Sequence, residues 1–376
     1  MNNMRLTIDK EQLLKAVTAA DHAIASKNPI PLMANLKLEL NEKGLEVTGS
    51  NSEVTIRSTV PYRIGEREII RGPGNGATLI NAHLFTEVVR RIEGTEVSFE
   101  VIDETIAKLD DGRSSFKLNC IRADEYPDID LEPNGVTLDL PCSDFLSLVE
   151  QSAFAASTKE QRPVLTALNL ESGAGKLIAT ATDSARLAQK FVAIESEAKF
   201  RCNVPAKILG DVTRLFDDAP RLTLCVSDNR ILFICGNTVV SSRLVSGDYP
   251  VTKAIIPQTF NYYLEVNAQE FLNAMSRVSL LSAERESVVK LTMREDEVEI
   301  SAKSEASGSA NEHLRIFSFT GERLNVSFNS LFVIDAIKAL KSEDVTLCFQ
   351  AEMKPFVVKN PKDDSVIELI TPMRTY

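Results

Sequence analysis

A polar turn interrupts an otherwise apolar stretch of the chain, which reads LIATATDSARLA over residues 177–188. The carboxyl of Asp183 and the hydroxyl of Ser184 are groups that serve enzymes as base and nucleophile when a partner group activates them. Thr, Asp and Ser following a strand of β-forming residues are equally typical of a plain hairpin turn. The stretch therefore has two interpretations, an active-site loop or a structural turn.

No convergent set of reactive groups accompanies this turn. The histidines His22, His83 and His313 lie far apart in the sequence, and none belongs to an HExxH or similar metal-ligand pattern. Ser184 lacks the GxSxG context of a hydrolase nucleophile. The segment GPGNG at 72–76 lacks the Lys-Ser/Thr of a phosphate-binding loop and predicts an ordinary loop. We therefore expect no catalytic residue, no cofactor and no metal site.

Length, charge and cysteine usage narrow the class of protein. At 376 residues the chain exceeds what one hydrophobic core usually serves, and its net charge of −11 argues against a general nucleic-acid-coating protein. The six cysteines form no CxxC pair, which favours buried thiols in a reducing compartment over disulfides or zinc. The N-terminus shows no secretory signal, and no apolar run is long enough to cross a bilayer. We expect a soluble, cytoplasmic protein without membrane contact.

The elements that must position the turn recur along the chain. Apolar residues at helical spacing predict six helices, over 10–25, 82–92, 143–156, 206–216, 268–281 and 330–340. Period-two alternation predicts hairpin-linked strands between them. One constant offset relates Leu13 to Phe145 and Leu45 to Leu177. These regularities indicate three tandem repeats.

Each repeat alternates one helix with several hairpin-linked strands, twice over. The predicted fold class is therefore α+β, with three tandem copies of a domain in which two helices pack on one face of an antiparallel sheet. We place the domains at 1–127, 128–250 and 251–376, because Tyr-Pro pairs close the first two copies. Asn51 and Ser52 of the first repeat occupy the positions of Asp183 and Ser184. The turn thus recurs with different side chains, which favours a structural or binding protein over an enzyme.

Basic residues lie on, or just beyond, each predicted helix. They are Lys10, Lys15, Lys27, Arg90, Arg91, Lys159, Arg162, Lys207, Arg214, Arg277 and Lys338. One interpretation is an ordinary solvated helix surface, and the other is a basic lining that faces a phosphate backbone. Acidic neighbours such as Glu11, Asp21 and Asp335 weaken the second interpretation, and the absence of tryptophan argues against base stacking.

Several short motifs, taken in order with the repeats, resemble one known family over the whole chain. They are RPVL at 162–165, ATDSARLA at 181–188, Tyr249-Pro250 with IIP at 255–257, KPF at 354–356 and the tail LITPMR at 369–374. This combination resembles the bacterial replicative sliding clamp, the beta subunit of DNA polymerase III.

The resemblance implies a non-catalytic protein that acts as a head-to-tail homodimer. Two chains of three domains would close into a six-domain ring with helices inside, encircling duplex DNA independently of sequence. Its implied partners are the polymerase III catalytic subunit, the clamp loader, and other replication and repair proteins.

The resemblance also implies two sets of site residues. The groove for partner peptides would use Leu165, Thr182, Ser184, Arg186, Leu187, Pro250, Ile255, Pro355, Ile370, Pro372, Met373 and Arg374. The contacts to DNA would use Lys27, Lys159, Arg162, Lys207 and Lys253. In the groove, Leu165, Leu187, Ile255 and Met373 would form an apolar pocket, with Arg186 and Arg374 at its polar rim.

The sequence departs from the more familiar family pattern at several positions. They are Ser184-Ala185 in place of Gly-His, Ala254 in place of an arginine, Glu286 near an often aromatic position, and the Thr375-Tyr376 extension. These departures bear on affinity and peptide preference.

Two hypotheses from other classes stay open on the sequence alone. The chain could be a multidomain scaffold that binds peptides and never encircles DNA, in which case it could be an open monomer. It could also be a hydrolase that uses Asp183 or Ser184, although no base or oxyanion partner is visible.

Overall fold

The computed structural model describes residues 4–25, 30–72, 74–216, 219–282, 287–295 and 297–374. The chain divides into two compact units, one of residues 1–142 and 210–244 and the other of residues 143–209 and 245–376. The division falls within the second repeat because the neighbouring repeats share sheets. Strand β4 of the first repeat pairs with β19 of the second, and β15 of the second pairs with β28 of the third.

Six α-helices occur among the described residues. They are α1 (Lys10–Asp21), α2 (Ala82–Arg91), α3 (Cys142–Glu150), α4 (Ala206–Phe216), α5 (Ala268–Ser279) and α6 (Ser330–Leu340). The predicted bounds of α4 and α6 are confirmed, whereas those of α1, α3 and α5 ran two to six residues too far. Short 3₁₀ turns, η1 (Pro31–Ala34), η2 (Ala123–Glu125), η3 (Ala153–Ala155) and η4 (Pro163–Thr166), lie in the loops.

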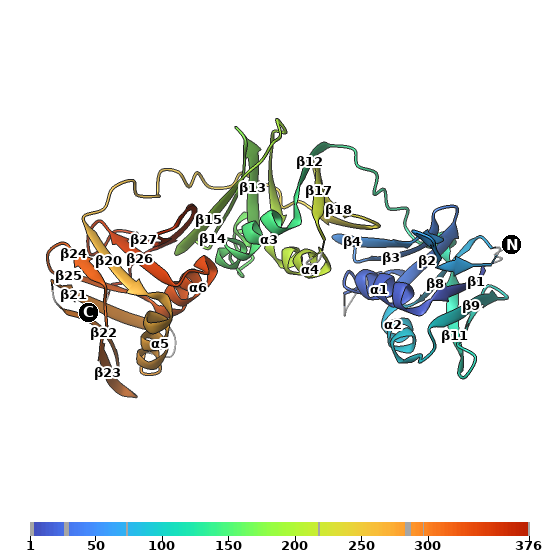
Figure 1. Ribbon diagram of the computed structural model, residues 1–376, viewed down its shortest axis with the longest axis horizontal. Helices are drawn as coiled ribbons and strands as arrows, with labels where there is room; N and C mark the ends of the chain where they lie inside the picture. The colour runs from blue at the N-terminus through green and yellow to red at the C-terminus, as the bar shows by residue number, and fades with distance from the viewer. Residues whose placement is uncertain are drawn as a thin grey trace. The chain divides into compact units, whose positions relative to one another are not determined.

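The first unit is built on a thirteen-stranded antiparallel sheet (Figure 1). In spatial order its strands are β12 (Val136–Pro141), β17 (Arg221–Val226), β18 (Arg230–Cys235), β19 (Thr238–Arg243), β4 (Val54–Val60), β3 (Gly44–Ser50), β2 (Asn35–Asn41), β8 (Gly76–Asn81), β11 (Ser115–Arg122), β10 (Ile106–Asp110), β9 (Glu96–Ile102), β1 (Arg5–Asp9) and β7 (Ile70–Arg71). A small ribbon of β5 (Arg63–Ile64) and β6 (Arg67–Glu68) stands apart.

The second unit contains two sheets. The larger has the order β16 (Phe200–Pro205), β13 (Ala167–Gly173), β14 (Lys176–Thr182), β15 (Arg186–Ala193), β28 (Asp363–Ile370), β27 (Phe356–Asn360), β26 (Asp344–Phe349), β20 (Tyr262–Asn267) and β24 (Ser318–Thr320). The smaller has the order β23 (Gly308–His313), β22 (Glu297–Ser304), β21 (Val288–Arg294) and β25 (Leu324–Asn329). All strand pairs in this unit are antiparallel.

Four of the described helices begin in the same way, because a capping side chain lies just before each of them. Asp9, Asn81, Asn267 and Asn329 each accept a hydrogen bond from a backbone N–H in the first turn of the helix that follows. Such a cap satisfies an N–H that the helix leaves unpaired, and removing it typically costs about 1 kcal/mol. The caps at Asp9, Asn81 and Asn329 lie where the sequence repeats predicted that helices begin.

In the first and third repeats, apolar helix faces close a core against the sheet. Helices α1 and α2 lie side by side beneath β2, β3 and β8, with Phe85 of α2 fully buried (Figure 1). Helices α5 and α6 contact each other in the third repeat, where Phe271 and Phe328 belong to the core. The six cysteines are free thiols, five buried and Cys235 half-buried. No described helix is long and apolar enough to span a membrane.

Candidate functional site

The polar turn at the end of β14 is a network of short-range hydrogen bonds, and we call residues 182–186 the corner. The Oδ1 atom of Asp183 accepts hydrogen bonds from the backbone N–H groups of Ala185 and Arg186, at 2.9 and 3.0 Å. The hydroxyl of Thr182 donates to the carbonyl of Arg186 and accepts from the N–H of Ser184. Ser184 adopts a left-handed conformation with φ of 81°. These are the contacts of an Asx turn.

The first repeat contains the same turn with different chemistry. The Oδ1 atom of Asn51 accepts from the N–H groups of Glu53 and Val54, and Ser52 has φ of 75°. Since the geometry recurs without the carboxylate, the turn itself belongs to the architecture, as the repeat predicted. The side chains of the second copy are what distinguish it.

Arg186 is largely enclosed, with only 14% of its side chain exposed. Its Nε donates to Asp183 Oδ2 at 3.0 Å, its Nη1 to Asp335 Oδ2 on α6 at 2.8 Å, and its Nη2 to the carbonyl of Phe154 in η3 at 3.0 Å. The role of Arg186 in a polar rim stays a prediction. Each of its donor nitrogens is engaged within the chain, so the side chain lies behind the surface that the corner presents.

The last described residues run from the corner into the third repeat, and we call residues 371–374 the tail. The N–H of Thr371 donates to the carbonyl of Ala185 at 2.9 Å, and the N–H of Met373 donates to the carbonyl of Ser327 on β25 at 2.7 Å. Pro372 is buried, Met373 is half-buried and Arg374 is exposed. The tail thus presents Met373 and Arg374 beside the corner.

The structure brings several of the other expected groove residues to the same pair of strands. Ile370 pairs with Arg186 across β28 and β15, and Pro355 precedes Phe356, which pairs with Ile370 from β27. Leu187 is buried with Leu369 and Val357, and Ile256 packs on that cluster while its neighbour Ile255 is 50% exposed.

Exposure divides these residues into a floor and an outer surface. Leu165, Thr182, Leu187 and Ile370 are buried. The outer surface consists of Ser184, Pro250, Ile255, Arg374 and the half-buried Pro355 and Met373.

Four of the five residues expected to contact DNA lie among the described residues. Lys159, Lys207 and Lys253 are exposed, and Lys27 lies outside the described residues. The Nη1 of Arg162 is 3.5 Å from Ser184 Oγ and donates to it, so this arginine lies at the corner.

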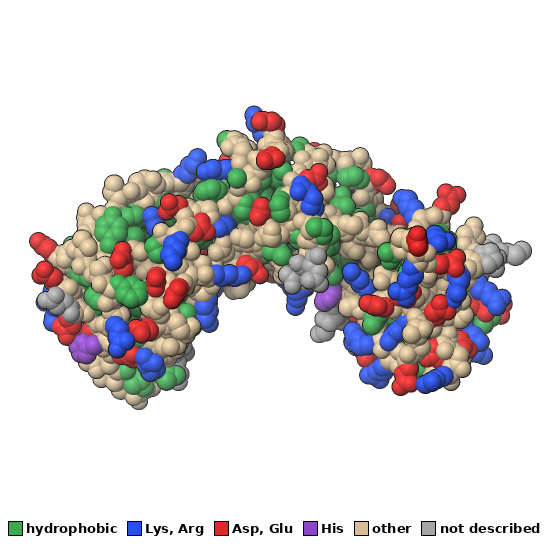
Figure 2. Space-filling model, in the orientation of Figure 1, with side chains coloured by type: hydrophobic (Ala, Val, Ile, Leu, Met, Phe, Trp, Pro, Cys, Tyr) green, Lys and Arg blue, Asp and Glu red, His purple; other side chains and the backbone are tan. Residues whose placement is uncertain are grey.

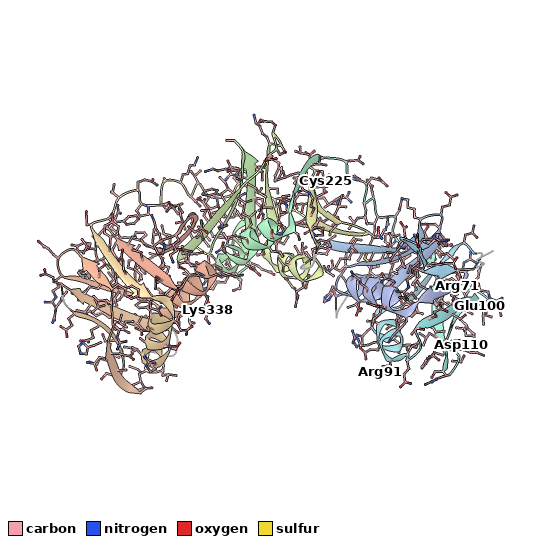
Figure 3. All side chains as sticks on the ribbon, in the orientation of Figure 1. Arg71, Arg91, Glu100, Asp110, Cys225 and Lys338 are labelled. Carbon is pink, nitrogen blue, oxygen red and sulfur yellow. The ribbon has the colours of Figure 1, made fainter. Side chains whose placement is uncertain are left out.

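Several basic residues on the helices pair with acids in the same repeat. Arg90 and Arg91 contact Glu87 on α2, Arg214 contacts Asp211 on α4, and Arg277 contacts Glu312 of β23. Figure 2 shows the same mixture, since Lys and Arg side chains alternate with Asp and Glu over the first repeat. Figure 3 places Arg91 at the end of α2 and Lys338 on α6, and Lys338 is exposed.

The positions that depart from the family pattern are placed as follows. Ala185 is half-buried and offers its carbonyl to the tail, whereas Ala254 is exposed. Glu286, Thr375 and Tyr376 lie outside the described residues. Among the residues with a described placement, no group of three His, Cys, Asp or Glu side chains could hold a metal ion.

A buried acid lies beside Arg186. Glu368 on β28 is 2% exposed, and its Oε1 atom has no hydrogen-bond partner. Burial raises the pKa of this carboxyl well above its ordinary value of 4.5, although the charge of Arg186 opposes the shift. Glu368 is therefore protonated in the folded chain at pH values where the unfolded chain has lost that proton.

Replacing Glu368 with Gln is expected to stabilise the protein at neutral pH. The folded wild type keeps a proton that unfolding releases, so its free energy of unfolding falls as pH rises from about 4.5 towards the raised pKa, by at most about 1.4 kcal/mol per pH unit. Gln removes this dependence. Urea unfolding of both proteins at pH 5 and pH 8 would measure it, and an equal difference at the two pH values would contradict the assignment.

Three domain families match the chain in succession. They are the N-terminal domain of the DNA polymerase III beta subunit at residues 4–130, its central domain at 139–251 and its C-terminal domain at 253–374. The chain belongs to the DNA polymerase III beta subunit family. The resemblance seen in the sequence is thereby confirmed.

Curated relatives and solved structures agree with this membership in the beta clamp family. The beta sliding clamp of Bacillus subtilis is 33% identical over 378 residues, which cover 99% of this chain and all of the relative. That of Staphylococcus aureus is 31% identical over 376 residues, with the same coverage. The crystal structure of the Bacillus subtilis DNA polymerase sliding clamp superposes with a TM-score of 0.96 at 32% identity, over the full length of both chains. That of the Streptococcus pneumoniae DNA polymerase III beta chain gives 0.94 at 31%, covering 99% of this chain and all of that one. The predicted clamp fold is confirmed.

The sequence analysis did not identify the residues that contact Arg186 of the corner from other elements. Asp335 and Phe332 of α6 and Phe154 of η3 all contact Arg186, but none was assigned to the site. One signal was available. Arg186 replaces Val54 of the equivalent corner, and a charge in place of a half-buried aliphatic residue requires a partner.

Proposed function

We propose that two copies of this chain close head to tail into a ring of six clamp domains that encircles duplex DNA and tethers the replicative polymerase. The domains would meet at residues 127 and 250, and the ring would have no catalytic activity. The chain acts as a sliding clamp in this proposal, as its family membership supports. The main support for the ring is that one strand edge in the first repeat and one in the third repeat are incompletely paired.

The first edge is on β11. Its residues 115–119 pair with β10, whereas only Cys120, Ile121 and Arg122 pair with β8 on the other side. The second edge is β23, for which β22 is the only partner among the described strands. Open edges favour pairing with another chain. Joining the β11 edge of one copy to the β23 edge of another is a heterologous contact, which supports a ring when it closes after two copies.

Charge supports enclosure as the means of holding DNA. The net charge is −11, and many of the basic side chains are already paired with acids. Such a protein would bind DNA weakly on its surface. A topological link needs no strong contact, so exposed Lys159, Lys207 and Lys253 suffice as diffuse phosphate contacts in the proposal.

The corner and the tail are proposed to bind short peptides from the polymerase catalytic subunit, the clamp loader and other replication and repair proteins. Apolar side chains for this role are the exposed Ile255 and Pro250, the half-buried Met373 and the buried Leu165 and Leu187. Apolar residues of a peptide could bury against these side chains.

Retention on circular DNA tests the ring. In solution, light scattering should give twice the chain mass of 41.5 kDa. After loading onto nicked circular duplex DNA by a clamp loader, the protein should stay on the circle through gel filtration. It should then be lost when a restriction enzyme linearises the circle. Equal retention on both forms, or a monomer in solution, would favour the peptide-binding scaffold instead.

A further inference from the structure

We propose that Arg186 is a positioning residue, which anchors the corner to α6 through Asp335 and so sets the shape of the peptide-binding surface without touching the peptide. This inference rests on the proposed function, because it concerns how that same surface is held. It assigns to Asp335, outside the expected groove, an influence on peptide affinity.

The contacts of Arg186 with the corner make one rigid unit of side chain and turn. Asp183 accepts two backbone N–H groups with Oδ1 and the Nε of Arg186 with Oδ2. The same carboxylate therefore closes the turn and orients the guanidinium. Because charge-assisted hydrogen bonds of this kind are shorter and stronger than neutral ones, a movement of Arg186 would carry the corner with it.

The other side of the guanidinium is held by two further elements. Asp335 and Phe332 are one helical turn apart on α6, where the carboxylate accepts from Nη1 at 2.8 Å and the Phe332 ring centroid lies 4.6 Å from the guanidinium carbon. On the η3 side, the carbonyl of Phe154 accepts from Nη2, and its ring centroid lies at 5.4 Å. The planar fork of arginine suits such a combined arrangement of ion pair and aromatic stacking, which lysine cannot reproduce.

The corner is also hydrogen-bonded to the tail. The carbonyl of Ala185 accepts from the N–H of Thr371, and Ile370 lies directly opposite Arg186 in the strand pair. The exposed Ser184 and the half-buried Met373 of the proposed groove are thus both connected to the backbone that Arg186 fixes. If Arg186 lost its anchor on α6, we expect both sides of the surface to become less well defined.

Two aspartates form ion pairs with the guanidinium of Arg186. Asp183 pairs with its Nε at 3.0 Å, and Asp335 pairs with its Nη1 at 2.8 Å. Asp183 cannot hold α6, since it lies in the corner itself. Asp335 is therefore the charged link from Arg186 to the third repeat.

The first repeat offers an internal comparison. At the equivalent corner the position of Arg186 is taken by Val54, and the α4 position that corresponds to Asp335 is Asp211. Asp211 pairs instead with Arg214 of its own helix, at 2.6 Å. The same Asx turn is thus present in both repeats, whereas the anchor to the following helix distinguishes the one at the proposed binding surface.

The test measures peptide affinity in a double-mutant cycle of Arg186→Met and Asp335→Asn. The probe is a fluorescein-labelled synthetic peptide that carries the clamp-binding segment of the polymerase III catalytic subunit of the same cell. We expect each single variant to weaken binding about five- to tenfold and the double variant to be no weaker than Arg186→Met alone. Asp335→Glu should recover most of the affinity, and the matched control Asp211→Asn should bind as the wild type does.

Several outcomes would overturn the inference. If Arg186 contacted the peptide itself, Arg186→Met would weaken binding while Asp335→Asn would not. Multiplicative losses in the double variant would likewise exclude a shared mechanism.

Two further measurements separate this inference from general destabilisation and from the proposed function. Thermal unfolding and light scattering of each variant show whether it stays folded and dimeric. If Asp335→Asn fails to fold, Phe332→Leu replaces it, with an expected two- to threefold loss of affinity, and wild-type affinity in that variant would contradict the anchor. Failure of the wild type to bind the peptide would refute the proposed function instead.

Discussion

Removal of residues 373–376 is expected to lower the affinity for a partner peptide ten- to a hundredfold while the dimer stays intact. The truncation deletes Met373, a half-buried apolar side chain beside the corner, and the exposed Arg374. Burying a methionine side chain contributes roughly 1.5–3 kcal/mol, and each 1.4 kcal/mol corresponds to about a factor of ten in affinity. The dimer should persist, because the tail is attached to β25, which lies at the opposite end of its four-stranded sheet from the β23 edge.

Fluorescence anisotropy with the labelled polymerase peptide would measure this loss, and light scattering would report the dimer. Met373→Ala and Arg374→Ala divide the effect between the apolar and the charged side chain, and we expect the larger share from Met373. Lys338→Ala, an exposed change on α6, serves as a control that should keep wild-type peptide affinity. An unchanged dissociation constant for the truncated protein would contradict the assignment of the tail to the binding surface.

The sequence predicted those elements that local patterns determine. The Asx turn at 182–186 and its copy at Asn51 follow from side chains that accept hydrogen bonds from their own backbone, so no distant residue is needed to specify them. The starts of α2 and α6 follow similarly from Asn81 and Asn329, which cap the helices they precede.

The end of α3 was mispredicted because tertiary contacts determine it. Ala153 and Phe154 continue the apolar spacing of the helix, yet the α-helix ends at Glu150 and η3 follows. The hydroxyl of Ser152 donates to the carbonyl of Leu148, and the carbonyl of Phe154 accepts from Arg186. A periodic pattern carries no information about a partner 32 residues away, and the same is true of Asp335, which is 149 residues from Arg186.

The order and spacing of the sequence motifs were enough to predict the family. They were not enough to predict the role of each site residue. The motifs named Leu187 and Ile370, which lie on paired strands, but they did not show that Arg186 is enclosed or that Arg162 donates to Ser184. Exposure depends on which neighbouring elements pack against a residue, and a motif records only the residue type.

Asp363→Ala is expected to destabilise the protein by about 2–3 kcal/mol. The substitution removes an ion pair between β15 and β28, the strands at which the second and third repeats share a sheet. Lys190 on β15 has only 8% of its side chain exposed, and its Nζ donates to Asp363 Oδ2 at 3.0 Å and to Ser365 Oγ at 2.6 Å. Removing the carboxylate leaves a nearly buried ammonium group without a counter-charge. Such a change costs about 3–5 kcal/mol in a fully buried pair, and we expect less here because 35% of the Asp363 side chain is exposed to water.

Urea unfolding at pH 7 would measure the loss, and the chain supplies a matched control. Asp110 on β10, which is labelled in Figure 3, is equally exposed and pairs with Lys108 at 3.3 Å, but that lysine is 36% exposed. Asp110→Ala should therefore destabilise the protein much less than Asp363→Ala does, because ion pairs between exposed groups contribute little. The double variant Lys190→Met with Asp363→Ala should recover most of the stability, because no unpaired charge remains buried. A double variant as unstable as Asp363→Ala would show that the charge is not the cause.

The effect of Asp363 should also depend on pH in a defined direction. Burial raises the pKa of this carboxyl, but hydrogen bonds from Ser365 and Lys190 outweigh burial and leave the pKa below its ordinary value of 3.8. A lowered pKa stabilises the folded state above the unfolded value, and the contribution is lost as pH falls through the folded value. The difference in unfolding free energy between the wild type and Asp363→Ala should therefore be constant from pH 5 to pH 8 and shrink below about 3.8. Since Glu368→Gln gains stability above pH 4.5, the two variants should respond to pH in distinct windows although both residues lie on β28.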